Sequence, residues 1–88
     1  MPLISLFSSL RRLAGVSRAQ ASGATVRQAI ETLCVDNAAL RDAILHDGAL
    51  RANVRVMING YDVELAQGLD TPVKVDDQMA IFPPIAGG

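Results

Sequence analysis

The sequence predicts an α+β fold in which one main helix lies across one face of a mixed β-sheet. Apolar residues recur at helical spacing between residues 26 and 34, which indicates an amphipathic helix. Short apolar or β-branched segments before and after it have the length and pattern of strands. The helix stripe and one sheet face must both be buried, and they bury each other when they pack together. A chain of 88 residues has room for one such core.

The first part of the chain is predicted to supply two strands and a short helical turn. Residues 3–7 form a brief apolar run that fits a buried strand. Residues 9–14 place apolar groups three positions apart, and Gly15 is suited to end that turn. Residues 16–22 alternate weakly between polar and small side chains, which fits an exposed strand that pairs with the first.

The main helix is expected to begin after Thr25, a suitable N-cap, with Gln28 completing a capping box. Its buried stripe consists of Val26, Ala29, Ile30, Leu33 and Cys34. Residues 36–37 interrupt the pattern, and a second short helical stretch is expected to stop at residues 46–48. The apolar positions of that second stretch are Leu40, Ile44 and Leu45.

A hairpin is predicted in the second half of the chain. Residues 54–58 are β-branched at alternate positions, so the side chains facing the core should be Val54, Val56 and Ile58. The Asn59-Gly60 pair supplies the positive φ angles of a tight turn, and residues 61–65 are predicted to return as a strand.

The last strand is predicted at residues 79–82. A loop punctuated by Gly and Pro precedes it from residue 66 to residue 72, and Asp76-Asp77 marks a further turn. The folded domain is therefore expected to span residues 1–82, followed by an extended tail at residues 83–88.

Composition narrows the classes of function. Half of the residues are apolar and 3% are aromatic, so the core must be aliphatic. Eight basic and nine acidic residues give a formal charge of −1, which argues against direct binding of nucleic acid or a membrane surface. One cysteine can form neither an internal disulfide nor a cysteine metal site, so we expect a cytoplasmic protein without a bound metal. Neither a signal peptide nor a membrane-spanning helix is expected.

The tail is the most informative segment. Pro83 and Pro84 cannot continue a paired strand, so the chain should leave the sheet as a stiff arm that reaches about 20 Å. Its end is thin because Ala86, Gly87 and Gly88 carry almost no side chain. A frayed terminus is the ordinary alternative, but the proline pair and the direct exit from a core strand favour insertion into a partner.

The chemistry of such a terminus requires activation. A carboxylate at Gly88 is an anion at neutral pH and a poor acyl electrophile. An ATP-using partner could convert it to an acyl-adenylate, from which a sulfur donor could displace AMP. The sequence contains no P-loop, Gly-rich phosphate motif or His/Cys/Asp constellation, which agrees with catalysis by the partner.

Three segments carry a resemblance to a known family. They are residues 54–60 (VRVMING), residues 68–73 (GLDTPV) and residues 76–88 (DDQMAIFPPIAGG). With them the chain resembles the ubiquitin-like sulfur carriers of the β-grasp fold, and it is most similar to the small subunit of molybdopterin synthase. The resemblance covers essentially the whole chain and is dense after Val54.

The resemblance implies a reaction centred on Gly88. A ubiquitin-activating-type enzyme would use ATP to adenylate Gly88, and sulfur transfer would convert it to a thiocarboxylate. The acceptor would be the large subunit of molybdopterin synthase, which builds the dithiolene of molybdopterin. The chain would be a carrier subunit of a sulfurtransferase, with no bound cofactor. The residues implied to bind partners are Phe7, Phe82, Pro83, Pro84, Ile85, Ala86 and Gly87.

Several alternatives remain open at the level of sequence. Longer loops before the hairpin and at residues 66–70 are similar to carriers for tRNA thiolation, cysteine synthesis or conjugation to protein lysines. Carrier and modifier would share the acyl-adenylate and differ in whether sulfide or an amine attacks it. Phe7 and Phe82 could instead be core residues, since Phe is often buried. A passive tail would predict that deleting Gly87 and Gly88 has no effect.

Three further side chains receive structural interpretations. Cys34 lies on the apolar helix stripe, where a buried and inert thiol is expected. His46 falls near a predicted helix end and has no neighbouring metal ligands in the sequence pattern. Lys74, the one lysine of the chain, could pair with an acidic partner surface, but an isolated solvated charge is the simpler interpretation.

Overall fold

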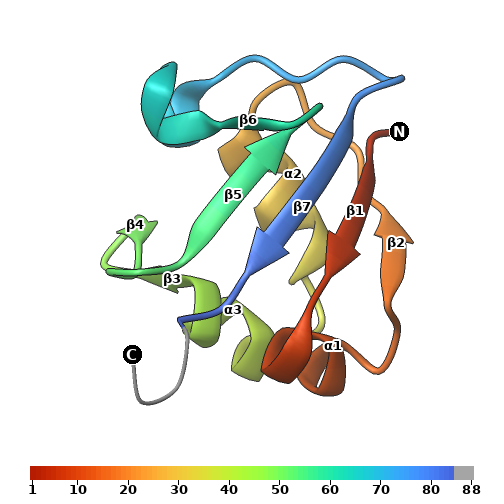
Figure 1. Cartoon of the computed structure of the whole chain (residues 1–88). Coiled ribbons are helices and arrows are strands. Elements are labelled where there is room, and N and C mark those ends of the chain that lie inside the picture. The colour runs from red at the N-terminus through yellow and green to blue at the C-terminus, as the bar shows by residue number, and fades with distance from the viewer. Residues whose placement is uncertain (85–88) are drawn as a thin grey trace.

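The computed structural model describes residues 1–84 as a five-stranded mixed sheet with helices packed on one face (Figure 1). Along the sheet the strands follow the order β2-β1-β7-β5-β6, with β1 parallel to β7 and the other neighbours antiparallel. The strands are β1 (Leu3–Leu6), β2 (Arg18–Gln20), β5 (Arg55–Ile58), β6 (Tyr61–Asp62) and β7 (Gln78–Phe82). The predicted α+β class is confirmed, and the arrangement is the β-grasp fold. The predicted sites at Ile85, Ala86, Gly87 and Gly88 lie outside the described residues.

The helices follow the sequence pattern closely. They are α1 (Ser8–Ala14), α2 (Val26–Leu33) and α3 (Ala38–Ile44). Gly15 ends α1 in the left-handed conformation with φ 78°, and its N–H donates to the Arg11 carbonyl at 2.9 Å. The predicted stop at Gly15 is therefore confirmed.

Thr25 caps α2 as predicted, and Gln28 closes the cap in a slightly different way. The Gln28 N–H donates to Oγ1 of Thr25 at 3.2 Å. In return, the Gln28 side-chain oxygen accepts from the N–H of Ala24 at 2.9 Å, one residue before the expected partner. Both interactions satisfy backbone donors that the first helical turn leaves free.

The core lies between α2 and the inner face of the sheet. The helix contributes Val26, Ala29 and Ile30, with Cys34 at its end. The central strands contribute Ile4, Leu6, Val56, Ile58, Met79 and Ile81. In residues 1–84 the fully buried positions are apolar, as the aliphatic composition requires.

The predicted returning strand at residues 61–65 is wrong beyond its second residue. β6 ends at Asp62, and Val63–Leu65 form a 3₁₀ turn. The Asp62 carboxylate accepts from the N–H of Glu64 at 2.9 Å, which stabilises the turn over an extended strand. The turn also buries Val63 in the core. The alternation of a short strand does not by itself show that Val63 is the buried residue.

Smaller differences occur at other boundaries. β1 ends at Leu6 and β7 begins at Gln78, each one residue from its predicted limit. Leu45, predicted as helical, opens a two-stranded hairpin of β3 (Leu45–His46) and β4 (Ala49–Leu50). A second 3₁₀ turn, Gly68–Asp70, lies within the predicted loop.

Candidate functional site

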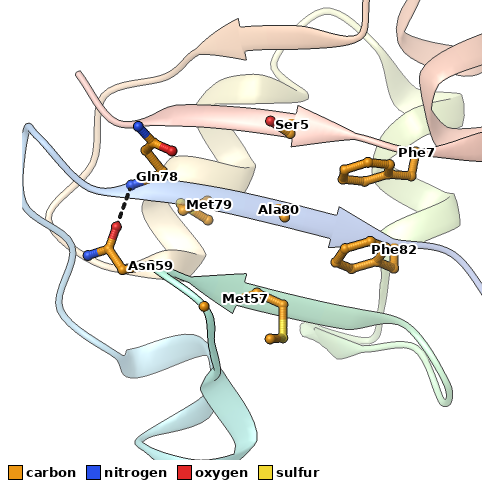
Figure 2. Close-up of a pocket in the computed structure, with 9 residues that line it drawn as sticks. Ser5, Phe7, Met57, Asn59, Gln78, Met79, Ala80 and Phe82 are labelled. Atoms are coloured by element: carbon orange, nitrogen blue, oxygen red, sulfur yellow. Dashed lines mark hydrogen bonds between the residues drawn. The ribbon is translucent and has the colours of Figure 1, made fainter.

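The face of the sheet opposite α2 carries no helix within residues 1–84, and the strand register arranges its side chains in rows (Figures 1 and 2). In the middle row Ala80 of β7 lies between Ser5 of β1 and Met57 of β5. The next row places Phe82 opposite Arg55. We call this surface, formed by Ser5, Phe7, Arg55, Met57, Ala80 and Phe82, the open face.

Phe7 and Phe82 form the apolar end of the open face. Their ring centroids lie 4.5 Å apart and the ring planes differ by 10°, so the rings are stacked. The two residues remain 38% and 37% exposed, which excludes the alternative that they belong to the core. Alternation explains their position, because Leu6 and Ile81 immediately before them point into the core.

Ser8 fixes where β1 ends. Its φ of 51° lies in the left-handed region, which is uncommon for a residue other than Gly. Phe7 before it is still extended, with φ −124° and ψ 151°, so its side chain keeps the strand alternation. The chain then turns into α1, and Phe7 stays on the open face.

The polar end of the open face is tied together by Asn59. Its Oδ1 accepts from the N–H of Gln78 at 3.0 Å, and its Nδ2 donates to Asp77 Oδ1 at 2.9 Å (Figure 2 shows the first bond). Asp77 Oδ2 accepts from the N–H of Lys74 at 2.8 Å. These bonds to Lys74 and Asn59 hold the pKa of Asp77 below its ordinary value. The turn after β5 is thereby fixed to the start of β7, and Asn59 and Gly60 have the predicted positive φ.

A depression of about 350 Å³ runs along this face between the two ends. It is lined by Ser5, Phe7, Met57, Asn59, Gly60, Gln78, Met79, Ala80 and Phe82. The lining is mostly apolar in its middle and polar at the Asn59 end. Such a surface suits contact with another protein chain.

A basic side chain lies beside the point where the tail leaves. Arg55 is paired in register with Phe82, the last residue of β7. Its Nη1 lies 2.9 Å from Asp62 Oδ2, with the Arg side chain 69% exposed and the Asp side chain 16% exposed. Pro83 is half-buried and Pro84 is exposed, so the tail departs from this end of the sheet.

The other three side chains considered from the sequence, Cys34, His46 and Lys74, lie outside the open face. Cys34 is buried, and desolvation, with the nearby Glu31 charge, raises its pKa to about 11. His46 lies in β3, where its exposed Nε2 is 3.4 Å from Asp47 Oδ2. Lys74 is exposed beside the turn into β7. Within residues 1–84, no group of three His, Cys, Asp or Glu side chains is placed to hold a metal ion. The helices of that part are too short to cross a membrane.

Sequence reasoning singled out the two phenylalanines and missed most of their surroundings. Met57 lies on the face away from the core, as the alternation in residues 54–58 implies, but its place between Phe82 and Asn59 depends on the pairing of β5 with β7. Ala80 and Ser5 are too small and too common to suggest a surface. Ser5 and Ala80 meet because β1 pairs with β7. These strands lie near opposite ends of the chain, so no short segment of the sequence indicates their contact.

Comparison with known proteins gives consistent similarities. A sequence from Archaeoglobus fulgidus that carries the name of a sulfur carrier protein is 35% identical over 65 residues, which cover 73% of this chain and 74% of that one. Small archaeal modifier protein 3 of Haloferax volcanii is 32% identical over 65 residues, which cover 74% and 71%. A chain in the crystal structure of the Amycolatopsis orientalis BexX/CysO complex superposes with a TM-score of 0.91 at 29% identity, covering all of both chains.

The family model matches nearly the whole chain. Residues 4–88 match the model of the ThiS family, so the match includes the first strand, the open face and the C-terminal glycines. This extent agrees with the β-grasp topology and with the similarity to named carriers and modifiers. The chain belongs to the ThiS family of ubiquitin-like sulfur carriers.

Proposed function

We propose that this protein carries sulfur as a thiocarboxylate on Gly88. The observation that carries the proposal is the stacked Phe7–Phe82 pair on a helix-free sheet face, directly before the residues that lead to the Gly-Gly end. An exposed pair of large aromatic rings favours contact with a partner. The same partner could then receive the terminal carboxylate, because docking face and tail are adjacent in the chain.

The proposed chemistry has two steps. An activating enzyme joins a Gly88 carboxylate oxygen to the α-phosphorus of ATP, and pyrophosphate leaves. A hydrosulfide-equivalent sulfur then attacks the carbonyl carbon, the C–O bond to AMP breaks, and AMP departs with the electron pair. The product is a Gly88 thiocarboxylate, which is a sulfur nucleophile for an acceptor enzyme. No side chain of the carrier is required in either step.

The open face would serve both partners in turn. Phe7, Phe82 and Met57 offer apolar contact area, while Arg55 and Asn59 supply polar groups at its rim. Pro83 and Pro84 would hold the following residues away from the sheet, and the absence of side chains at Gly87 and Gly88 would admit the end to a narrow active site. Ile85 and Ala86 would line the entrance to that site.

For the acceptor we propose the large subunit of molybdopterin synthase. The support is the resemblance of residues 76–88 to the small subunit of that enzyme. The test is a reconstitution in which purified thiocarboxylated carrier is mixed with that large subunit and the cyclic pterin precursor. Formation of the dithiolene product is expected, and a carrier that keeps its sulfur would contradict this choice of acceptor.

A second candidate function is supported by the names of the relatives. One relative is named as an archaeal modifier, and another match lies in a complex that contains CysO. The chain could accordingly be joined to lysines of other proteins or supply sulfur in another pathway. Both functions would use the same activated Gly88. A modifier would differ in the attacking nucleophile, an amine in place of sulfide, whereas a carrier for another pathway would differ only in its acceptor.

Intact mass spectrometry of the protein from its native cells separates a sulfur carrier from a lysine-linked modifier. Replacement of one terminal oxygen by sulfur adds about 16 Da, which must be located in the C-terminal fragment because Met or Cys oxidation adds the same mass. Sulfur at Gly88 is the expected result. An unmodified end together with lysine-linked adducts would instead establish the modifier function.

A further inference from the structure

The chain has few side-chain amines for a protein whose carboxyl end is proposed to become an acyl electrophile. Of its eight basic residues seven are Arg, and Lys74 is the one lysine. An unprotonated lysine amine is a nucleophile that can attack an activated carbonyl. A guanidinium stays protonated in proteins and does not compete in this way. The positive side-chain charges of this protein are thus carried almost entirely by guanidinium groups, which are not amine nucleophiles.

The fold places Lys74 at the end of the sheet opposite to the tail. The Asp77 N–H donates to the Lys74 carbonyl at 3.0 Å, which fixes Lys74 beside the start of β7. The strand then runs from Gln78 to Phe82 before the tail leaves. Because β1 is parallel to β7, Met1 also lies at the starting end, where the N–H of Leu3 donates to the Asp77 carbonyl at 3.2 Å (Figure 1).

The distance from Lys74 to the start of the tail is close to the largest distance that residues 85–88 and a lysine side chain could bridge. Four residue steps along β7 span about 13 Å, and the two steps to Pro84 add about 6 Å. Residues 85–88 can span at most about 14 Å, to which a lysine side chain adds about 6 Å. The Gly88 carbonyl would therefore reach Lys74 only along a fully extended path that reverses after Pro84 and retraces the strand. A stiff proline pair opposes that reversal.

Among the basic residues of the paired strands, Arg55 is the one that the register places opposite Phe82, the last residue of β7. Arg55 pairs with Phe82, so its side chain is anchored one strand away from the start of the tail. Because Phe82 lies two residues before Pro84, the backbone of position 55 is at most about 12 Å from Pro84, which is less than the span of four residues. The 69% exposed guanidinium there supplies charge and an ion pair to Asp62 at 2.9 Å, but no amine.

We propose that the distribution of Arg and Lys protects activated Gly88 from acylating its own chain, with Arg55 as the specificity-determining residue. The inference rests on the proposed activation of Gly88. In the reaction that is avoided, an amine nitrogen bonds to the Gly88 carbonyl carbon, the bond to the leaving group breaks, and the amine proton passes to water. The chain would thereby be lost as an internal amide before sulfur arrives.

The test uses the chain Met1–Gly88 with Gly88 converted to a thioester of 2-mercaptoethanesulfonate, so that no activating enzyme is needed. The thioester is held in mildly alkaline buffer and products are identified by intact mass and peptide mapping. An internal amide is one water lighter than the hydrolysed acid, and its mapped lysine identifies the site. The variants are Arg55→Lys, Lys74→Arg, and Arg27→Lys as a matched control.

Arg27→Lys is a fair control because it adds one amine on α2, where Arg27 contacts Gly48 and Asp70 on the other side of the sheet. We expect Arg55→Lys to form at least tenfold more internal amide than the unchanged chain or Arg27→Lys. Lys74→Arg should form no less than the unchanged chain. A thermal unfolding curve verifies that Arg55→Lys is folded, as expected because lysine can keep the ion pair to Asp62.

Two results would overturn the proposal. One is an Arg55→Lys variant that forms no more internal amide than Arg27→Lys, and the other is efficient internal acylation of Lys74 or of the Met1 amine in the unchanged chain. A dimer joined through Lys74 supports the proposal, since it shows a reactive amine that its own tail does not reach. Because the thioester is installed chemically, these results are independent of whether sulfur is found on Gly88 in cells.

Discussion

The ring of Phe7 lies parallel to the ring of Phe82, with the centroids 4.5 Å apart. The two residues come from opposite ends of the chain and meet because β1 and β7 are neighbouring parallel strands. The stack therefore joins the first strand to the residue from which the tail departs. In the proposed function, a partner that contacts this pair would also be positioned to receive the tail.

Removing one ring should uncouple the pair at a small cost in stability. Aromatic pairs contribute about 1 kcal/mol beyond area burial, so a double-mutant cycle of Phe7→Ala and Phe82→Ala should give a coupling free energy of about that size. Chemical denaturation measures it. Tyr61→Ala is the control, because Tyr61 is 74% exposed and its loss should change stability by less than about 0.5 kcal/mol. A coupling of zero would show that the stack is not maintained in solution.

The Gly88 end should be essential for activity and irrelevant to stability. We expect Gly88→Ala, or removal of Gly88, to abolish thiocarboxylate formation while the melting temperature stays within error, because the buried core residues found in residues 1–84 lie between Ile4 and Ile81. A sulfur-transfer assay and thermal unfolding measure the two properties. A bulky residue added after Gly88 should be equally harmful unless it is removed. An unchanged transfer rate in any of these variants would refute a mechanism at the terminal carboxylate.

Asp77 should make stability depend on acid pH. Its pKa lies below the ordinary value of 3.8 in the folded state because Lys74 and Asn59 donate hydrogen bonds to the carboxylate. A lowered folded pKa stabilises the protein above the unfolded pKa, and this contribution disappears as the pH falls through the folded pKa. The melting temperature of Asp77→Asn should consequently fall less than that of the unchanged protein below about pH 4. The neighbouring Asp76→Asn variant serves as control and should follow the unchanged protein.

Cys34 should be unreactive in the folded protein. Burial disfavours the thiolate and raises the pKa to about 11, so very little thiolate exists at neutral pH. Alkylation by iodoacetamide should be slower than in the unfolded chain by roughly tenfold or more, because burial and the raised pKa of the thiol both suppress the reactive thiolate. Cys34→Ala should retain full sulfur transfer and lose about 1 kcal/mol of stability through the smaller side chain. Rapid alkylation of the native protein, or loss of transfer in the variant, would give Cys34 a functional role.

Gly23 should tolerate no side chain. A Cβ at this position would lie 2.5 Å from the backbone nitrogen of Ala29 and 2.9 Å from its Cα, so α2 would have to move away from the preceding loop. Gly23→Ala is expected to cost about 2 kcal/mol or more in the free energy of unfolding. Gly48→Ala is the matched control, since Gly48 has open space and only its φ of 78° to oppose alanine, at about 1 kcal/mol. Equal losses in the two variants would mean that α2 shifts freely.

Local chemistry in the sequence determined the elements that depend on neighbouring residues. Thr25 begins α2, Gly15 ends α1, and Asn59-Gly60 turns the hairpin, because a cap or a positive φ is a property of a few adjacent positions. The alternation of side chains along β5 likewise places Val56 in the core and Met57 on the opposite face of the sheet. The match of residues 4–88 to the ThiS family agrees with the resemblance carried by the C-terminal segment.

Local preferences failed where tertiary contacts compete with them. Residues 61–65 alternate like a strand, yet the capping carboxylate of Asp62 and the buried Val63 turn the chain after two residues. Leu45 continues a helical pattern, but it pairs with Leu50 in a hairpin. In both segments the local preference is weak, and contacts with other parts of the chain override it.

The sequence by itself determined the β-grasp elements and the thin Gly-Gly end. Only the tertiary structure decided that Phe7 stacks on Phe82, that Arg55 stands beside the tail exit, and that Lys74 lies at the far end of the sheet. The physical reason is that these relationships depend on the parallel pairing of β1 with β7 and the antiparallel pairing of β7 with β5. Such pairing is set by burial of one sheet face against α2, a property of the whole chain that no short segment contains.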